Sequence, residues 1–337
     1  MKRKFFDSKN TTIWGKLGLI FLPTLFLIAM VEGGTRLLIW ALYGSPTHGM
    51  HWVFEYEPYL LTKTNKGHRM HQDVPPKGET YRIVLIGGST AQQIPEKLFE
   101  EAFKTISARD IEVINLAQGG YIINQERIML LLYGIRYNPD LIITIDGMND
   151  IVTSLKIGRL GLPYSNAFIA FAVDHPIFNG VLSVLRKSQF INAINKLREK
   201  HDEKLLQNNA VLWDETIDHI EEGIQSIAVI AKGMTIPYIA VLQPYVHLRK
   251  NTLDIEKQLS SEFDYRKDFM NKTISKLNNR LRNLSSQPEV YYVDATPICD
   301  LSKLQCFRDE VHLTTDGNKL LVAHIVNAVK ENGFKVQ

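Results

Sequence analysis

From residue 81 onward, short apolar runs alternate with longer amphipathic stretches. Each run ends at a turn former, as buried strands of a parallel sheet do, and the stretches between them have the spacing of helices. This alternation predicts right-handed crossovers and a mostly parallel sheet with helices on both faces. The expected strands are 81–88, 111–117, 140–147, 235–244 and 290–296, and the expected helices are 96–107, 124–137, 214–232, 262–284 and 315–332.

The N-terminal part of the chain has a different pattern. A basic tail, residues 1–12, precedes an apolar stretch that carries no charge from Leu17 to Val31 and reaches back to Ile13. Residues 13–31 make about 19 positions, close to the roughly 20 that a membrane-spanning helix needs. A second apolar stretch follows Glu32 and Arg36, which are spaced to pair on one helix. We therefore predict a transmembrane anchor over 13–43.

A cleaved signal peptide is the main alternative for this segment. No A-x-A-like site follows the apolar run, which favours an anchor that stays on the protein. The basic residues lie before or at the start of the span, and none lies between Gly44 and Thr62. The positive-inside rule then places the N-terminus in the cytoplasm and residues 80–337 outside it, in the periplasm or the extracellular space.

Composition narrows the function classes. Of 337 residues, 45% are hydrophobic and 22% charged, which excludes disordered and collagen-like classes. The net charge of +3 comes from the basic tail, so no basic surface for nucleic acid is expected on the globular part. Residues 44–79 are rich in turn formers and are expected to be a linker. Their two His-x-x-His pairs suggest surface histidines rather than a metal site, and no metal is expected.

Ligands of such sheets bind beyond the carboxyl ends of the strands, where this sequence places several polar and glycine residues. Ser89 follows the first strand after two glycines, Gly120 follows the second strand, and Asn149 follows the third. Asp309 and His312 follow the last strand, spaced so that the carboxylate can orient the imidazole as a general base. Taken singly, each has an ordinary structural role, such as a helix cap, a loop glycine or an Asx turn.

Three familiar motifs are absent. The sequence has no GxxxxGK[ST] phosphate loop and no GxGxxG dinucleotide fingerprint. It also lacks the G-x-S-x-G nucleophile elbow, because Ala91 occupies the last place of that motif.

The four strand-end motifs, GGST, NLAQGGY, DGMND and DEVH, resemble in order the blocks of the SGNH/GDSL hydrolase superfamily. This resemblance covers about 81–330 and implies a flavodoxin-like three-layer α/β/α fold. It implies Ser89 as nucleophile, His312 as general base and Asp309 as the residue that orients His312. The implied oxyanion donors are the backbone N–H groups of Ser89 and Gly120 and the side chain of Asn149.

Two positions depart from the common form of these blocks. Gly88 stands where the family usually has aspartate, and Tyr121 follows the glycine where many members have aspartate. Because membrane-anchored relatives often carry GGS, the first departure points to a subfamily rather than to different chemistry.

The resemblance implies a serine esterase that works without a cofactor through a covalent acyl-enzyme. Together with the anchor, it points to O-acyl groups, such as acetyl, on carbohydrate or lipid of the cell envelope. An O-acyltransferase that modifies an exported polysaccharide is an open alternative, since the four motifs do not separate the two activities. A non-catalytic glycan-binding module is a further alternative, although such a module has no need of His312.

Cys299 and Cys306 lie shortly before Asp309. Outside the cytoplasm they could form a disulfide that clamps this segment. Two free buried thiols are the equal alternative.

Overall fold

The computed structural model describes residues 13–43, 54–57, 59–64, 76–161, 188–191, 193–194, 197, 201 and 207–334. The chain divides into two units, which are described separately. One unit holds residues 1–53 and 172–200, and the other, called the body here, holds 54–171 and 201–337.

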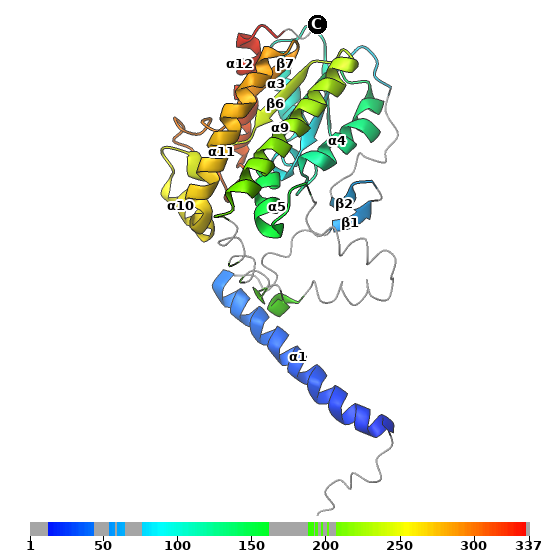
Figure 1. Ribbon diagram of the computed structural model, residues 1–337, viewed down its shortest axis with the longest axis vertical. Coiled ribbons are helices and arrows are strands. Elements are labelled where there is room, and N and C mark those ends of the chain that lie inside the picture. The colour runs from blue at the N-terminus through cyan, green and yellow to red at the C-terminus, as the bar shows by residue number, and fades with distance from the viewer. Residues whose placement is uncertain are drawn as a thin grey trace, which may run out of the picture. The chain divides into compact units, whose positions relative to one another are not determined.

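The body is built on one five-stranded parallel sheet (Figure 1). The strand order is β4-β3-β5-β6-β7, so the first strand of the sheet is an inner one and its two neighbours come next in the chain. This is the order of flavodoxin-like sheets, in which the crevice lies where the winding direction reverses, here between β3 and β5. The strands are β3 (Tyr81–Gly87), β4 (Ile111–Asn115), β5 (Leu141–Asp146), β6 (Tyr238–Leu242) and β7 (Val290–Asp294).

The predicted fold class is therefore confirmed, and all five expected strands are present. Each is shorter than its apolar run by up to a few residues, because the run includes the turn that follows the strand. The helices of the body are α2 (Ser89–Gln92), α3 (Glu96–Lys104), α4 (Ile123–Leu132), α5 (Asn149–Ile157), α9 (Ala210–Gly233), α10 (Asp254–Ser260), α11 (Lys267–Leu281) and α12 (Thr315–Glu331).

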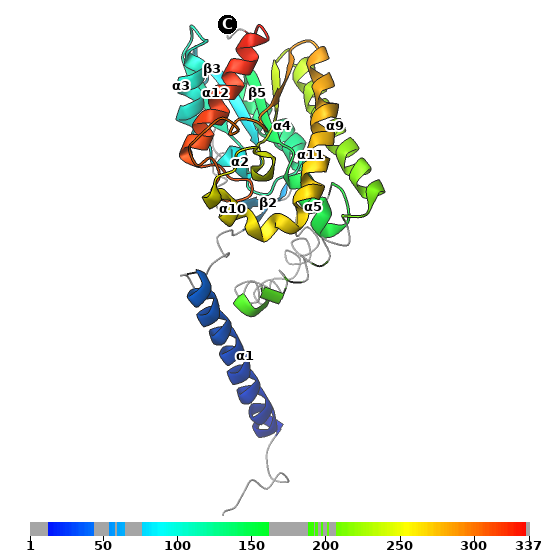
Figure 2. The same cartoon turned by 90° about the vertical axis from the view of Figure 1, so that its left-hand side faces the viewer.

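The two faces of the sheet have separate cores. Along β3, Ile83 and Leu85 pack toward α3 and α12, whereas Val84 and Ile86 pack toward α4, α5, α9 and α11. Figure 2 shows α3 and α12 on one side of the sheet and α4, α9 and α11 on the other. Since successive side chains of a strand point to opposite faces, strands that are apolar at every position serve both cores at once.

The expected linker over 44–79 contains an element that its turn-rich pattern did not indicate. Strands β1 (Phe54–Glu57) and β2 (Leu61–Thr64) form an antiparallel hairpin. Leu60 at its turn is fully buried in the core, and its carbonyl accepts a 2.7 Å hydrogen bond from the Gln125 side chain. The Glu57 carboxylate accepts 2.8 Å and 2.6 Å hydrogen bonds from the Tyr133 hydroxyl and the Leu60 N–H. The body thus begins at Phe54, because these buried contacts tie the hairpin to α4.

Helix α1 (Ile13–Tyr43) coincides with the predicted anchor. Among the described residues it is the one helix that is long and apolar enough to cross a membrane, over Phe21–Leu42, and none of that stretch is buried. Glu32 and Arg36 form the expected pair, with 2.9 Å between carboxylate and guanidinium.

If the hairpin is part of the body, Leu60→Ala will destabilise the protein by about 2–5 kcal/mol, the range for removing a fully buried leucine side chain. The matched control is Tyr59→Ala, since the Tyr59 side chain is 64% exposed. Thermal unfolding of the two full-length variants in detergent measures the difference. Equal midpoints for the two variants would show that the hairpin does not contribute to the body's core.

Candidate active site

Ser89, His312 and Asp309 form a continuous chain of hydrogen bonds at the carboxyl edge of the sheet. His312 Nε2 lies 2.8 Å from Ser89 Oγ, and His312 Nδ1 lies 2.6 Å from Asp309 Oδ2. Ser89 begins α2 directly after β3, whereas the other two residues lie 220 or more positions later, between β7 and α12. The structure therefore brings together the three side chains that the sequence motifs single out.

The partners of His312 fix its tautomer. Asp309 also accepts 2.9 Å and 2.7 Å hydrogen bonds from the backbone N–H groups of Val311 and His312. Partial burial opposes the charge of Asp309, but the hydrogen bonds and charge of His312 and the two N–H groups outweigh it and lower the pKa of this carboxyl. An ionised carboxylate can only accept, so Nδ1 carries the proton and Nε2 is left to accept the Ser89 hydroxyl proton.

The two glycines before Ser89 allow a close approach of neighbouring elements. Gly87 has φ +148°, and a side chain there would meet the Ile145 carbonyl of β5. At Gly88 a Cβ atom would overlap the Asn149 amide nitrogen. Any side chain at position 88, an aspartate included, would therefore displace the Asn149 amide from the place it occupies in this chain.

The turn that contains Gly120 is tied to the helix of Ser89. The Gln92 side chain on α2 accepts a 3.0 Å hydrogen bond from the Gly119 N–H. Asn115 at the end of β4 donates a 3.0 Å hydrogen bond to the Ala91 carbonyl. Gly120 has φ +80°, a left-handed conformation that favours glycine. Among the hydrogen bonds of the described residues none uses the Gly120 N–H, so this donor is available to a ligand.

Asn149 lies at the start of α5, after β5. Its amide nitrogen donates a 2.7 Å hydrogen bond to the Tyr121 carbonyl, in the turn next to Gly120. An amide NH₂ group has two N–H donors, so this bond orients the group and leaves the second N–H for another acceptor. Asn149 and Gly120 thus lie on two turns that a side chain–backbone hydrogen bond connects.

Buried carboxyl groups lie behind these turns. Asp150 accepts 3.2 Å and 3.1 Å hydrogen bonds from the Ile123 N–H, and so ties α5 to the start of α4. Its burial raises its pKa to about 7. Burial also raises the pKa values of Glu126 and Asp146, since a buried site disfavours several adjacent charges.

Two buried ion pairs hold the segment that carries Asp309 and His312. The first involves Glu310, which is 4% exposed and lies between those two residues. Its carboxylate accepts a 2.7 Å hydrogen bond from the Tyr245 hydroxyl and a 3.1 Å bond from Arg266 Nε, which precedes α11. The Glu310 carbonyl accepts a 3.1 Å bond from the Val246 N–H. Glu310 is therefore locked to the segment after β6.

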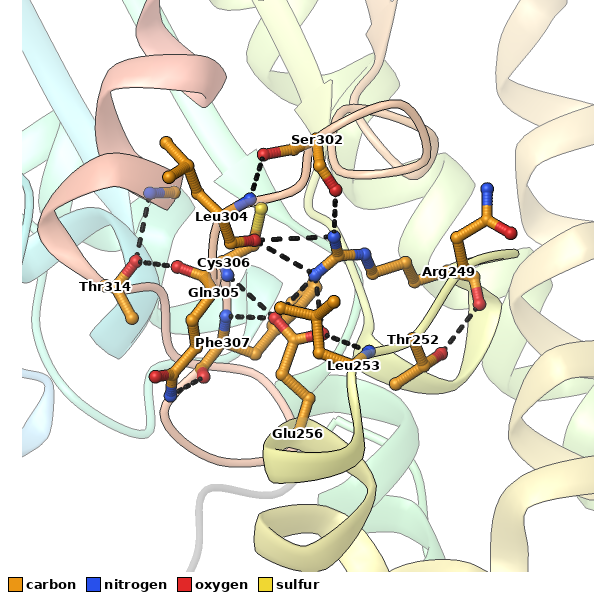
Figure 3. Close-up of polar contacts among 12 residues, drawn as sticks. Arg249, Thr252, Leu253, Glu256, Ser302, Leu304, Gln305, Cys306, Phe307 and Thr314 are labelled. Carbon is orange, nitrogen blue, oxygen red and sulfur yellow. Dashed lines mark hydrogen bonds and ion pairs between the residues drawn. The ribbon is translucent and has the colours of Figure 1, made fainter.

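The second ion pair is that of Arg249 with Glu256 on α10 (Figure 3). Glu256 Oε1 also accepts 2.7 Å and 3.0 Å hydrogen bonds from the Cys306 and Phe307 N–H groups. Arg249 Nη2 donates a 2.5 Å bond to the Ser302 carbonyl. Both charged side chains are almost completely buried, with 1% and 0% exposure. Each member thus replaces lost water contacts with backbone contacts from the loop that precedes Asp309.

Cys299 and Cys306 are buried free thiols in this loop. Their thiols are in hydrogen-bond contact, and this contact, together with burial, raises the pKa of Cys299. A disulfide between them stays a prediction.

The sequence patterns did not indicate the side chains that support the site. Glu310, Arg266, Arg249 and Glu256 are charged residues that hydrophobic periodicity assigns to the surface, yet all four are buried. One available signal was the position of Glu310 inside the DEVH motif. The other three are scattered in sequence, and only the fold shows their partners.

No group of three or more His, Cys, Asp or Glu side chains within the described ranges is arranged to hold a metal ion. The two His-x-x-His pairs, at 48, 51, 68 and 71, lie outside those ranges.

Glu256→Gln will leave the Arg249 charge buried without a counter-charge. Breaking a buried ion pair in this way costs about 3–5 kcal/mol. The control, Asp254→Asn, removes a fully exposed carboxylate from the same helix and is expected to change the free energy of unfolding much less. Thermal unfolding compares the two, and similar midpoints would contradict a supporting role for the Arg249–Glu256 pair.

Asp150→Asn will make stability less sensitive to pH. The folded protein holds the Asp150 proton up to about pH 7, whereas an aspartate in the unfolded chain has a pKa of 3.8 and loses the proton near that pH. Between these values the unfolded state binds fewer protons, so this group makes stability fall as the pH rises. Asparagine keeps an acceptor for the Ile123 N–H but cannot ionise.

The measurement is the free energy of unfolding at pH 5 and pH 8 for both proteins. The variant should gain stability relative to the wild type as the pH increases. A difference that is constant between the two pH values would contradict the raised pKa of Asp150.

Comparisons with known proteins give structural similarity only. No protein-family model and no curated protein matches the chain. The fold is similar to that of an acetylxylan esterase from Geobacillus stearothermophilus, solved as a catalytic mutant, at 14% identity and TM-score 0.45, covering 79% of this chain and 99% of that one.

Two lipase structures are similar to a comparable degree. A GDSL-like lipase from Bacteroides thetaiotaomicron has 16% identity and TM-score 0.45, covering 77% of this chain and 93% of that one. A lipase from a goat rumen metagenome has 13% identity and TM-score 0.48, covering 76% and 99%. These likenesses concern the α/β fold alone.

Proposed function

We propose that the protein is a serine ester hydrolase that acts through a covalent acyl-enzyme. The observation that carries the proposal is the hydrogen-bond chain from Ser89 Oγ through His312 to Asp309. A serine hydroxyl is a weak nucleophile unless an adjacent base can take its proton, and here the base lies within 2.8 Å and is itself oriented by a carboxylate.

In the first half-reaction, Ser89 Oγ attacks the ester carbonyl carbon while His312 Nε2 takes the hydroxyl proton. The carbonyl oxygen becomes an oxyanion in the tetrahedral intermediate. Asp309 stabilises the imidazolium that forms, since its pKa is held low and it stays ionised. The intermediate collapses when His312 donates the proton to the leaving alcohol oxygen, which leaves the acyl group on Ser89.

The proposed oxyanion donors are the Gly120 N–H, the Ser89 N–H and the Asn149 side chain. The Gly120 N–H has no acceptor among the described hydrogen bonds, and the Asn149 amide is oriented by Tyr121 with one N–H unused. Donors held in place before the reaction act without reorganisation, and each is worth about 2.7–4 kcal/mol of transition-state stabilisation.

In the second half-reaction, a water molecule attacks the Ser89 ester. His312 Nε2 now takes a proton from the water, and a second tetrahedral intermediate forms in the same donor site. Return of that proton to Ser89 Oγ releases the carboxylic acid and restores the resting site.

For the substrate we propose O-acyl groups, acetyl in particular, on carbohydrate or lipid of the cell envelope. This rests on α1 acting as an uncleaved anchor with the body outside the cytoplasm. Support for that arrangement comes from the length and apolar character of Phe21–Leu42 and from the basic residues before it.

Ser89→Ala is expected to lower kcat for p-nitrophenyl acetate by at least about 10³-fold, because it removes the attacking atom. The matched control is Ser286→Ala, which removes an exposed hydroxyl that donates a hydrogen bond to the Asn283 carbonyl, three residues earlier in the chain. The full chain in detergent is used for both. Equal rates for the wild type and Ser89→Ala would overturn the proposed mechanism, whereas a loss that is confined to Ser89→Ala supports it.

A further inference from the structure

In the unit that contains α1, a second segment contacts this helix. Residues 189–191, 193, 194 and 197 have helical backbone. The Glu32 carboxylate of α1 accepts a 2.6 Å hydrogen bond from the Ser188 hydroxyl and 2.8 Å and 3.2 Å bonds from the Gln189 and Phe190 N–H groups. These are N–H groups of a first helical turn, which have no partner within their own helix. Glu32 therefore caps the segment and joins it to α1.

This segment, called the 188–197 segment here, exposes an apolar stripe. Phe190, Ile194 and Leu197 are 42%, 49% and 74% exposed. Their spacing of four and then three residues places them on one face of a helix. Gln189, in contrast, is 2% exposed, so the segment has a covered side as well as an apolar open side.

The sequence that contains the stripe is basic. From Arg186 to Lys200 the sequence contains five Lys or Arg residues and one acidic residue, Glu199. A helical segment with an apolar stripe and a basic polar part has the composition of helices that lie in the interface of an anionic membrane.

The contact with Glu32 sets the depth of the segment relative to α1. Glu32 directly follows the uncharged stretch that ends at Val31, and it pairs with Arg36 at 2.9 Å. The apolar window Phe21–Leu42 includes this pair, but charged side chains are costly in the hydrocarbon core. We therefore place the core over the uncharged residues before Glu32, and the pair marks the place where the helix leaves it. From Ile13 to Val31 the helix measures about 28 Å, close to the roughly 30 Å of the core. A segment capped by Glu32 then lies at the membrane–water boundary.

We propose that the 188–197 segment is an interfacial helix, with Phe190, Ile194 and Leu197 inserted into the headgroup and acyl boundary of an anionic bilayer. The inference depends on α1 as the membrane anchor and is independent of the proposed ester hydrolysis. It would add a second membrane attachment, since the chain returns to the body after Lys200. The contact would be reinforced by the apolar area of three side chains and by attraction between lysines, arginines and anionic lipid.

Spin labels test the depth of the stripe in the full chain. Single cysteines at Phe190, Ile194 and Leu197 are labelled in a Cys299→Ala, Cys306→Ala background and reconstituted in vesicles of phosphatidylglycerol and phosphatidylethanolamine. Two matched positions calibrate the readout: Met30 on α1, 59% exposed in the apolar stretch, and Val229 on α9 of the body, 67% exposed. The readout is the accessibility of each label to oxygen and to a water-soluble nickel complex.

The labels at 190, 194 and 197 are expected to shift from nickel toward oxygen accessibility, as at Met30. Nickel accessibility equal to that at Val229 would overturn the proposal and would show that the stripe faces water or a protein partner instead of lipid. A second measurement avoids changes to the native cysteines: Phe190→Trp should gain fluorescence quenching by lipids brominated near the headgroup, and an absence of added quenching relative to the wild type would likewise overturn the proposal.

Discussion

The position of His312 depends on buried charge pairing rather than on regular secondary structure. Strand β3 places Ser89, but the residues from Cys299 to Thr314 form no helix and only an isolated bridge between Phe307 and Leu313. The pairs Arg249–Glu256 and Arg266–Glu310 tie this loop to the segment after β6, to α10 and to the residue before α11. Together with the Asp309 hydrogen bonds inside the loop, they hold an imidazole within 2.8 Å of a hydroxyl that is 223 positions away in the chain.

Buried ion pairs are a costly way to stabilise a loop, because both charges lose their hydration. What they provide here is a defined geometry. The Glu256 carboxylate accepts hydrogen bonds from two loop N–H groups and from Arg249 at the same time. Arg249 also donates hydrogen bonds to loop carbonyls, so these contacts together favour one arrangement of the loop. An apolar replacement of similar volume could fill the space, but it could not distinguish one loop conformation from another.

The carboxyl groups on the other side of the site work differently. Asp150 accepts hydrogen bonds from the Ile123 N–H at the start of α4 and directly follows Asn149 in the chain. It therefore connects the two turns that carry the proposed oxyanion donors. Its burial raises its pKa to about 7, and burial raises the pKa values of the neighbouring Glu126 and Asp146 as well. The turns are thus held by groups that need not be charged, whereas the histidine loop is held by groups that must be.

Much of this architecture could be predicted from the sequence, and the exceptions have a common cause. The inner strands β3, β5 and β6 are buried at every position and show as largely apolar runs, and the strand-end motifs lie where parallel sheets place their ligands. The sequence pattern does not show the β1–β2 hairpin, because each strand has only four residues and the hairpin places a single hydrophobic residue, Leu60 at the turn, in the core. Glu310 and Arg249 could not be assigned, because a pattern of polar positions does not show which charge is buried with a partner.

The most direct test of the central claim is the site of covalent modification by a fluorophosphonate, which reacts with activated serine hydroxyls. The account predicts one adduct, on the peptide that contains Ser89, formed much more slowly in a His312→Ala variant. The control His324→Ala removes an imidazole that bonds only the Asp294 carbonyl and should label at the wild-type rate. An adduct on another serine, or equal labelling rates in the wild type and His312→Ala, would contradict the assignment of Ser89 and His312 as nucleophile and base.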